Sequence, residues 1–185
     1  MKYVGLSVKR KEDPRLVRGE STYVDDIKLP GMLYAVFLRS PHPHARVRSI
    51  DVSEARALGG VYAAYTGADL KPFLGPLVVE TIYDEKRFVE HFPLAVDEVK
   101  FVGEPVAVVV AEDLYTAYDA LDLVKVEYEP LPSVTDPEKA LAENAPKVHN
   151  HLENNLCFRW RRVYGDVERL FKEADEVVEG RFRIQ

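Results

Sequence analysis

The chain has 185 residues, of which 46% are hydrophobic, so it is long and apolar enough to bury a core without disulfide staples. Its 25 basic and 31 acidic side chains give a net charge of -6, which excludes the overall basic footprint typical of nucleic-acid-binding proteins. The single cysteine, Cys157, excludes an internal disulfide, a multi-cysteine zinc site and an iron–sulfur cluster held by this chain alone.

The charge and proline patterns suggest how the chain is organised. The charged, poorly patterned residues 1–18 predict a solvated lead-in segment, and 19–185 predict a single domain. Within that domain, 70–95 is rich in proline and glycine and predicts a long loop with one strand candidate at 77–83. The final residues, 176–185, return to a strand-like alternation and stop there, as expected of part of a longer chain.

Two nearly continuous apolar runs, 33–40 and 61–66, each predict a buried strand. Two prolines follow the first run, so this part of the chain forms either two strands or one strand with an edge-type break. Between the runs, Ser53 is a candidate N-cap for a short helix over 53–58, which a Gly-Gly pair ends. A turn is expected at 67–69.

The clearest predicted unit is a strand at 106–111, a helix at 114–124 and a strand at 125–131. Apolar residues of the helix recur at i, i+3, i+7 and i+10, and Asp113 stands where an N-cap is expected. A crossover of about a dozen residues between two strands fits a right-handed βαβ unit with parallel strands, near 106–128.

Two further helices are predicted at 137–143 and 167–174, the first with Pro137 at its first helical position after Asp136 and the second with Asp166 as its N-cap. The residues between them, 144–165, have the composition of a loop. Together the elements predict an α+β fold, with a mixed, mainly buried sheet and flanking helices.

Histidines form the most suggestive candidate sites. His42 and His44 are two residues apart, so on a strand they would share a face, but no further ligand lies nearby in sequence, which favours a structural role over a metal site. A second polar patch is rich in asparagine and favours loop solvation or local capping over a binding loop; it contains His149, Asn150, His151, Asn154 and Asn155.

Two other features favour structural roles. Cys157 has Phe158 and Trp160 as neighbours, which indicates a buried thiol rather than a nucleophile. The cluster Arg159, Trp160, Arg161 and Arg162 is basic and aromatic, but one such cluster in an acidic chain indicates a salt-bridged surface or a partner contact rather than nucleic-acid binding.

The segment VGEPVA at 102–107 resembles a phosphate-binding loop only in its glycine. Phosphate loops follow a strand and open a helix, whereas this turn precedes a strand. We therefore expect a structural hairpin. In it, Gly103 adopts a backbone conformation that other residues avoid, and Pro105 has no N–H to donate to a neighbouring strand. No nucleophile elbow, zinc-protease motif or nucleotide-binding fingerprint is present, so residue types alone indicate no active site.

Four segments form one further pattern: GESTYVDDIKLPGMLYAVFLRSPHPHARVRSID at 19–51, SEARALGGVYAAYTGADL at 53–70, KFVGEPVAVVVAEDLYTAYDALDLVKVEYEPLPSV at 100–134 and GDVERLFKEADEVVEGRFRIQ at 165–185. Together they resemble the large, molybdenum-binding subunit of the molybdenum hydroxylases, the family of carbon monoxide dehydrogenase, aldehyde oxidase and xanthine dehydrogenase. The matching part of that subunit is its N-terminal α/β hammerhead domain, an α+β fold.

The resemblance implies oxidoreductase chemistry at a molybdenum–molybdopterin centre, with electrons leaving through iron–sulfur clusters and FAD on partner subunits or domains. In that family the pterin-binding loops, the active-site loop and the essential glutamate lie downstream of the hammerhead domain. No catalytic, cofactor-binding or metal-binding residue is therefore expected in this chain.

Three hypotheses follow. The first is a scaffold domain of a carbon monoxide or aldehyde oxidoreductase, inactive alone, whose partners are the rest of the molybdenum subunit and iron–sulfur and flavin subunits. The second is a stand-alone assembly module of the same fold, and the third is a ligand-binding domain that uses the loop 70–93 and the His-Asn patch. No membrane span or leader is visible in the sequence, so a cytoplasmic protein is expected, with a homo-oligomer as one option for its assembly.

Overall fold

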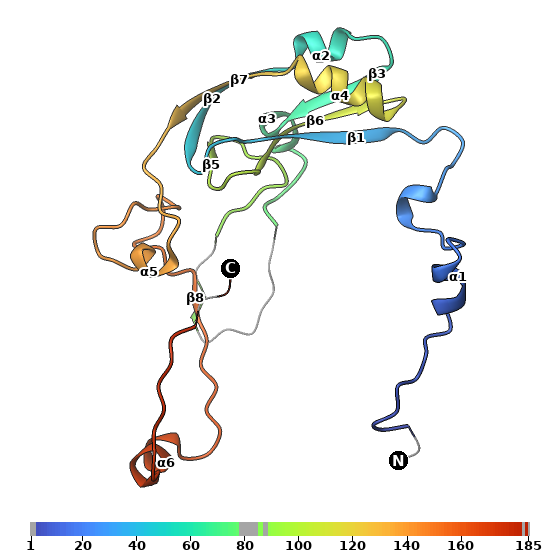
Figure 1. The fold of residues 1–185 in the computed structure, drawn as a ribbon. Coiled ribbons are helices and arrows are strands. Elements are labelled where there is room, and N and C mark those ends of the chain that lie inside the picture. The colour runs from blue at the N-terminus through green and yellow to red at the C-terminus, as the bar shows by residue number, and fades with distance from the viewer. Residues whose placement is uncertain (1–2, 78–84, 87–88, 183, 185) are drawn as a thin grey trace.

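The computed structural model describes residues 3–77, 85–86, 89–182 and 184 (Figure 1). Its helices and strands follow one another as α1 (Asp13–Val17), η1 (Val24–Asp26), β1 (Tyr34–Arg39), β2 (Ala45–Asp51), α2 (Ser53–Ala57), β3 (Val61–Thr66), α3 (Gly67–Leu70), β4 (Glu85–Lys86), β5 (Glu98–Val99), β6 (Pro105–Ala111), α4 (Leu114–Asp122), β7 (Lys125–Pro130), α5 (Pro137–Ala140), β8 (Phe158–Arg159) and α6 (Val167–Glu173). This mixture of antiparallel sheets and flanking helices confirms the α+β class.

Two three-stranded sheets form the body of the molecule. The first has the strand order β1-β6-β3 and the second has the order β5-β2-β7, while β4 and β8 pair separately. The helices α2 and α4 lie side by side on one face of the first sheet (Figure 1), where Ala117 and Ala120 pack against Val36, Ala64 and Val109. Small residues on the helix bring it close to the sheet, so this contact forms the main core.

A second, smaller core joins the two sheets. Ala45 of β2, Val99 of β5 and Val106 of β6 are fully buried there together with Ala95. The side chains of β6 thus serve both cores, one on each face of the strand, because successive residues of a strand point to opposite sides. This strand is the centre of the fold.

The predicted parallel βαβ unit is wrong in its pairing. The order strand, helix, strand is present as β6, α4 and β7, but β6 already pairs with β1 on one edge and β3 on the other. No edge of β6 is left for β7, which pairs antiparallel with β2 in the second sheet. Among the described strands every pairing is antiparallel, so the expected mixed sheet is two antiparallel sheets.

The run 33–40 and the segment 61–66 do form strands, β1 and β3, and the prolines separate β1 from a second strand, β2. The prediction that these strands are buried holds for Val36 and Ala64 on one face and is wrong for the other face, where Phe37 is 45% exposed and Tyr65 is 42% exposed. Both strands are edges of a sheet whose helices cover only one face, so the apolar residues of the other face remain exposed.

Most helix starts are as predicted. The carboxylates of Asp113, Asp136 and Asp166 accept backbone N–H groups in the first turns of α4, α5 and α6. Ser53 is not an N-cap: it is the first residue of α2, and its own N–H donates to the carboxylate of Asp51. The expected turn at 67–69 is the short helix α3, which a reciprocal capping box starts.

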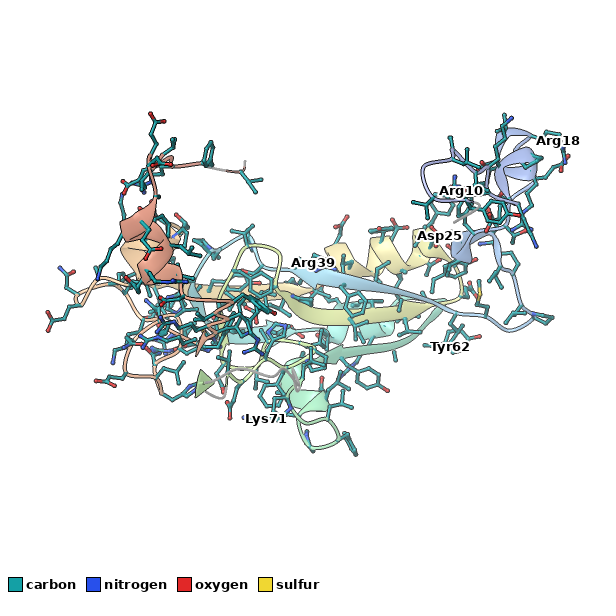
Figure 2. All side chains as sticks on the ribbon, turned by 90° about the horizontal axis from the view of Figure 1, so that it is seen from below. Arg10, Arg18, Asp25, Arg39, Tyr62 and Lys71 are labelled. Atoms are coloured by element: carbon teal, nitrogen blue, oxygen red, sulfur yellow. The ribbon has the colours of Figure 1, made fainter. Side chains whose placement is uncertain are left out.

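Two arms extend from this body (Figure 1). The first carries α1 and η1, and Figure 2 places Arg10, Arg18 and Asp25 on it, away from the sheets. The second carries α6, which is amphipathic as predicted but leaves Leu170 and Phe171 exposed by 57% and 63%. Neither arm has a fully buried residue within the described part of 3–30 or 156–182.

The strand predicted at the end of the chain is not found among its described residues, since 176–182 adopt no regular structure. The strand candidate at 77–83 lies outside the described residues except for Leu77. The division into a lead-in segment and one domain stays a prediction. No helix in the described ranges is both long and apolar enough to cross a bilayer.

Candidate functional site

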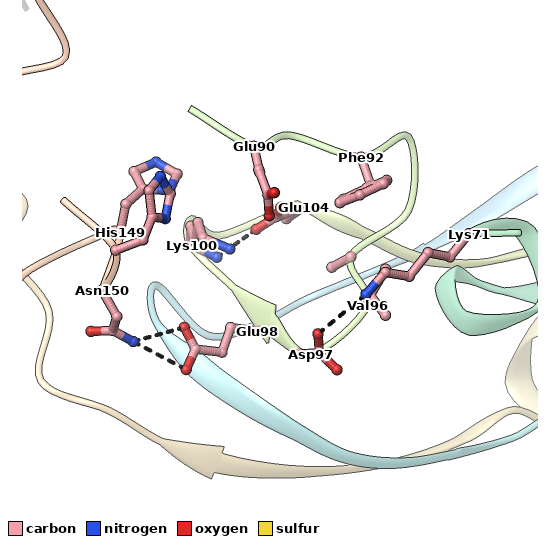
Figure 3. Close-up of a pocket in the computed structure, with 12 residues that line it drawn as sticks. Lys71, Glu90, Phe92, Val96, Asp97, Glu98, Lys100, Glu104, His149 and Asn150 are labelled. Atoms are coloured by element: carbon pink, nitrogen blue, oxygen red, sulfur yellow. Dashed lines mark hydrogen bonds and ion pairs between the residues drawn. The ribbon is translucent and has the colours of Figure 1, made fainter. Parts of the chain in front are cut away.

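A polar cavity of about 300 Å³ lies between the segment 90–104 and the loop 149–151 (Figure 3). Lys71, just after α3, closes it at one end, while His149 and Asn150 line the opposite end. The elements that meet here are far apart in the sequence, so the cavity is a product of the tertiary fold.

Acidic side chains outnumber basic ones around this cavity. Its lining contains the four carboxylates Glu90, Asp97, Glu98 and Glu104, against the two ammonium groups of Lys71 and Lys100. The exposed Asp97 lies 3.9 Å from the ammonium of Lys71 and forms an ion pair with it. The deeper carboxylates, Glu98 and Glu104, give the cavity its negative character.

Glu104 owes its position to a tight turn. Gly103 adopts φ +90°, the left-handed region that glycine tolerates, and its N–H donates to the carbonyl of Ser40 at 2.8 Å. The Glu104 side chain is 4% exposed, and its carboxylate accepts the backbone N–H of Lys100 (Figure 3). The conformation expected for Gly103 is therefore confirmed.

The expected hairpin at 102–107 is wrong, because the strands on either side of the turn do not pair with each other. β5 pairs with β2, whereas β6 starts at Pro105, opposite Arg39 of β1. The carbonyl of Pro105 accepts the N–H of Ala95 at 2.8 Å, which holds the wall of the cavity against β6. The turn thus connects two sheets.

Glu98 lies on β5 and faces the loop on the other side of the cavity. Its two carboxylate oxygens accept long hydrogen bonds of 3.3 Å from the amide of Asn150 (Figure 3). One of them also lies 3.9 Å from Nε2 of His44. These are weak contacts for a carboxylate whose side chain is only 17% exposed.

The two histidines of the PHPH segment have separate surroundings. His44 is buried, and its Nδ1 lies 2.7 Å from the carbonyl oxygen of Pro132. The ring of His42 stacks at a tilt on Tyr128, with 4.9 Å between ring centroids. Both precede β2, so they do not share a strand face, and no group of three or more potential metal ligands exists among the described residues.

His149 belongs to the cavity wall and also to an adjoining apolar hollow of about 240 Å³. Its Nδ1 is buried and has no hydrogen-bond partner within the described parts of the chain. Burial lowers the pKa of His149 from 6.5 to about 4, and the nearby charges of Lys100 and His151 contribute in the same direction. The ring is therefore neutral at neutral pH.

We expect acid to destabilise the protein through His149. Between pH 6.5 and about 4 the unfolded chain binds a proton on this ring that the folded chain does not, so stability falls as pH falls through this window. After allowance for solvent screening of the half-buried ring, the loss is about 1 kcal/mol near pH 5. Urea unfolding at both ends of the window, for wild type and His149→Gln, measures it; an unchanged pH slope in the variant contradicts this assignment.

Asn155 has a structural role in the neighbouring loop. The amide of Asn155 donates to the carbonyls of Ala140 and Pro146, and its oxygen accepts the N–H of Val148, which confirms local capping in this loop. Cys157 is half-buried, so the prediction of a buried thiol is wrong. The aromatic residues that suggested burial are themselves half exposed, because they lie on the arm beyond the body.

The basic-aromatic cluster lies at the start of this arm. The guanidinium of Arg162 is 5.4 Å from the ring centroid of Trp160. This cation–π contact is local and leaves Trp160 57% exposed. None of these cluster residues lines the cavity. Of the residues that do, the sequence marked only His149, Asn150 and His151 as candidates.

Residues 18–132 match the family described as "Aldehyde oxidase and xanthine dehydrogenase, a/b hammerhead domain". The chain belongs to this family. The matched range contains both three-stranded sheets and the helices α2 and α4, so the hammerhead fold expected from the sequence is confirmed.

Curated relatives and solved structures of this hammerhead family agree. The chain is 44% identical to the carbon monoxide dehydrogenase large chain of Afipia carboxidovorans, over 89% of this chain and 21% of that protein. It is 38% identical to the xanthine dehydrogenase molybdenum-binding subunit of Escherichia coli O157:H7, over 90% and 22%. Quinoline 2-oxidoreductase from Pseudomonas putida 86 superimposes with a TM-score of 0.81 at 40% identity, covering 95% of this chain and 22% of that one.

The hammerhead chain thus spans about a fifth of the length of the curated relatives it matches. Its described residues do not fit the molybdenum–pterin group that the family implies. No cluster of three metal-binding side chains exists among them, and the excess of carboxylates in the polar cavity repels an anionic phosphate.

Proposed function

We propose that this chain is the hammerhead scaffold of the large subunit of a molybdenum-dependent oxidoreductase, of the carbon monoxide or aldehyde type. The observation that carries the proposal is the match to about a fifth of each enzyme subunit, at up to 44% identity for the relatives above. In this proposal the chain supplies shape and docking surfaces, and it contributes no catalytic, cofactor-binding or metal-binding residue. Molybdenum chemistry belongs to the rest of the subunit.

The partners in this proposal are the rest of the molybdenum subunit and separate iron–sulfur and flavin subunits. One relative, 38% identical over 185 residues, is named the "6-hydroxypseudooxynicotine dehydrogenase complex subunit gamma" of Paenarthrobacter nicotinovorans, which supports assembly into a complex. The exposed apolar residues of both arms also support docking, since large bare apolar surfaces bind partners. A cytoplasmic location and a homo-oligomer remain predictions.

The test compares two preparations for molybdenum content and turnover. The first is the 185 residues expressed alone, and the second is the uninterrupted reading frame expressed together with its neighbouring subunits. We expect the 185 residues to hold no stoichiometric molybdenum and to show no turnover of carbon monoxide or aldehydes with dye acceptors. The complete assembly is expected to show both metal and turnover. Robust turnover by the 185 residues without added subunits would contradict the scaffold role.

The same experiment separates the alternative, a stand-alone assembly module of the same fold. The exposed arms favour docking in either case. A reading frame that runs on into the pterin-binding part supports the scaffold. A chain that copurifies with a separately encoded molybdenum subunit supports the module.

A further inference from the structure

The first sheet has a face that the described helices leave open. Helices α2 and α4 lie on the opposite face, over Val36, Ala64 and Val109 (Figure 1). The neighbouring residue of each strand points the other way. The strand register therefore places two rows of side chains on the open face, one of Ala35, Val110 and Ala63 and one of Phe37, Val108 and Tyr65.

This open face continues the second, smaller core. Val106 lies on the same side of β6 as Val108, and it is fully buried in that core. Beyond it the cover stops: Phe37 and Tyr65 on the two edge strands are 45% and 42% exposed. Val108 is 9% exposed, since these two larger side chains flank it on the central strand. A covered layer thus begins at Val106 and is unfinished two residues later.

A sheet face that lies in solvent has a different composition in this protein. On the second sheet, Arg46 and Arg48 of β2 form ion pairs with Glu129 of β7, and Glu127 is exposed on the same side of β7. Of the six residues on the open face of the first sheet, none is charged and only Tyr65 carries a polar group. Solvent-facing positions of antiparallel strands are normally polar, so the open face has the composition of a covered one.

The open face is too small to hold a separate protein on its own. Neighbouring strands are about 4.8 Å apart and successive residues on one face are about 6.8 Å apart, so three strands and two rows cover about 200 Å². A stable interface between separate chains buries about 800 Å² on each partner. A layer of the same polypeptide needs less area, because the covalent connection removes much of the entropic cost of association. The size favours a tethered occupant.

The length of the related subunits provides such an occupant. This chain covers 21% of the carbon monoxide dehydrogenase large chain and 22% of the xanthine dehydrogenase subunit reported above, so nearly four-fifths of each subunit is further polypeptide. That polypeptide is covalently connected to the matching region. It therefore meets the requirement that the small area of the open face sets.

We propose that the open face of the first sheet is covered by the part of the same large-subunit polypeptide that lies downstream of residue 185. This part packs apolar side chains against Phe37, Val108 and Tyr65 and completes the core that begins at Val106. The inference rests on the proposed function, because it requires the chain to be part of a longer subunit.

The test is site-specific photocrosslinking in the complete large subunit, purified with the subunits that copurify. Phe37→p-benzoylphenylalanine keeps an aromatic side chain on the open face and reacts on illumination with groups in contact with it. We expect the crosslinked subunit to keep the mass of one chain in a denaturing gel, and a peptide map to join the peptide of residue 37 to one downstream of residue 185. A crosslink to a partner subunit or to a second copy gives a larger band and overturns the proposal.

Two further variants make the result specific. Tyr65→p-benzoylphenylalanine, on the opposite edge strand, should crosslink to the same downstream region, and it replaces the first variant if that one fails to fold. The matched control is Glu127→p-benzoylphenylalanine, on the charged side of β7, which should give about tenfold less crosslink to that region because no contact is expected there. Equal yields at residues 37, 65 and 127 overturn the proposal.

The same preparation distinguishes this inference from the proposed function. A complete subunit that holds molybdenum and turns over, but crosslinks from residue 37 to a partner subunit, keeps the scaffold role and overturns the inference alone. A reading frame that ends after Gln185 overturns both, because no downstream polypeptide then exists.

Discussion

Replacement of Gly67 by alanine is expected to lower the free energy of unfolding by about 3 kcal/mol. A Cβ at this position would lie 2.2 Å from the carbonyl oxygen of Ala95 and 2.9 Å from that of Leu94. These are backbone atoms of a buried segment, which the hydrogen bond from Ala95 to Pro105 fixes against β6. In a chain of this length, thermal unfolding should show a midpoint lowered by roughly 6–12 °C.

Gly59→Ala is the matched control for this substitution. A Cβ at Gly59 meets nothing within 4 Å, and its φ is not in the left-handed region. Its unfolding midpoint should stay close to that of the wild type. If Gly67→Ala and Gly59→Ala unfold at the same temperature, the close approach of α3 to the cavity wall does not contribute to stability.

The contact at Gly67 also matters for the candidate site. The segment that would be displaced, Leu94–Ala95, leads directly into the cavity residues Asp97 and Glu98. Gly67→Ala should therefore shift these two carboxylates as well as lower the free energy of unfolding.

Features set by a few neighbouring residues were predictable from the sequence. Asp113, Asp136 and Asp166 cap their helices because an N-cap needs only a short acceptor and the next turn of backbone. The positive φ of Gly103 follows in the same way from a turn beside a proline. The N-cap prediction for Ser53 was wrong. Helix α2 already includes Ser53 as its first residue, and the carboxylate of Asp51 accepts the backbone N–H of Ser53.

Features set by tertiary partners were not predictable. The apolar pattern of β7 is the same whether it pairs with β6 or with β2, and only the occupied edges of β6 exclude the parallel arrangement. Likewise, the apolar run of β1 does not show that helices cover one face only. Phe37 is exposed for that reason, although it lies in a nearly continuous apolar segment.

The cavity lay largely beyond sequence reasoning for the same cause. His44 and Pro132 are 88 positions apart, and Asn150 is 52 positions from Glu98, so no local spacing relates them. Of the cavity residues, only His149, Asn150 and His151 were candidates from the sequence. Glu104, a charged residue between a glycine and a proline just before a buried strand, was a further local signal, and the structure buries its carboxylate inside the turn.

Val109→Ala is expected to lower the free energy of unfolding by about 2–3 kcal/mol, because it opens a cavity in the main core. Val109 is fully buried on the central strand, flanked by Val36 on β1 and Ala64 on β3, and Ala117 of α4 covers it. Small neighbours on the helix side leave little side chain that can move into the space. Urea unfolding measures the loss, and Val102→Ala, at a position 62% exposed, is the control that should change stability by less than about 0.5 kcal/mol. Equal effects of the two substitutions would show that β6 does not carry the core that positions both sheets.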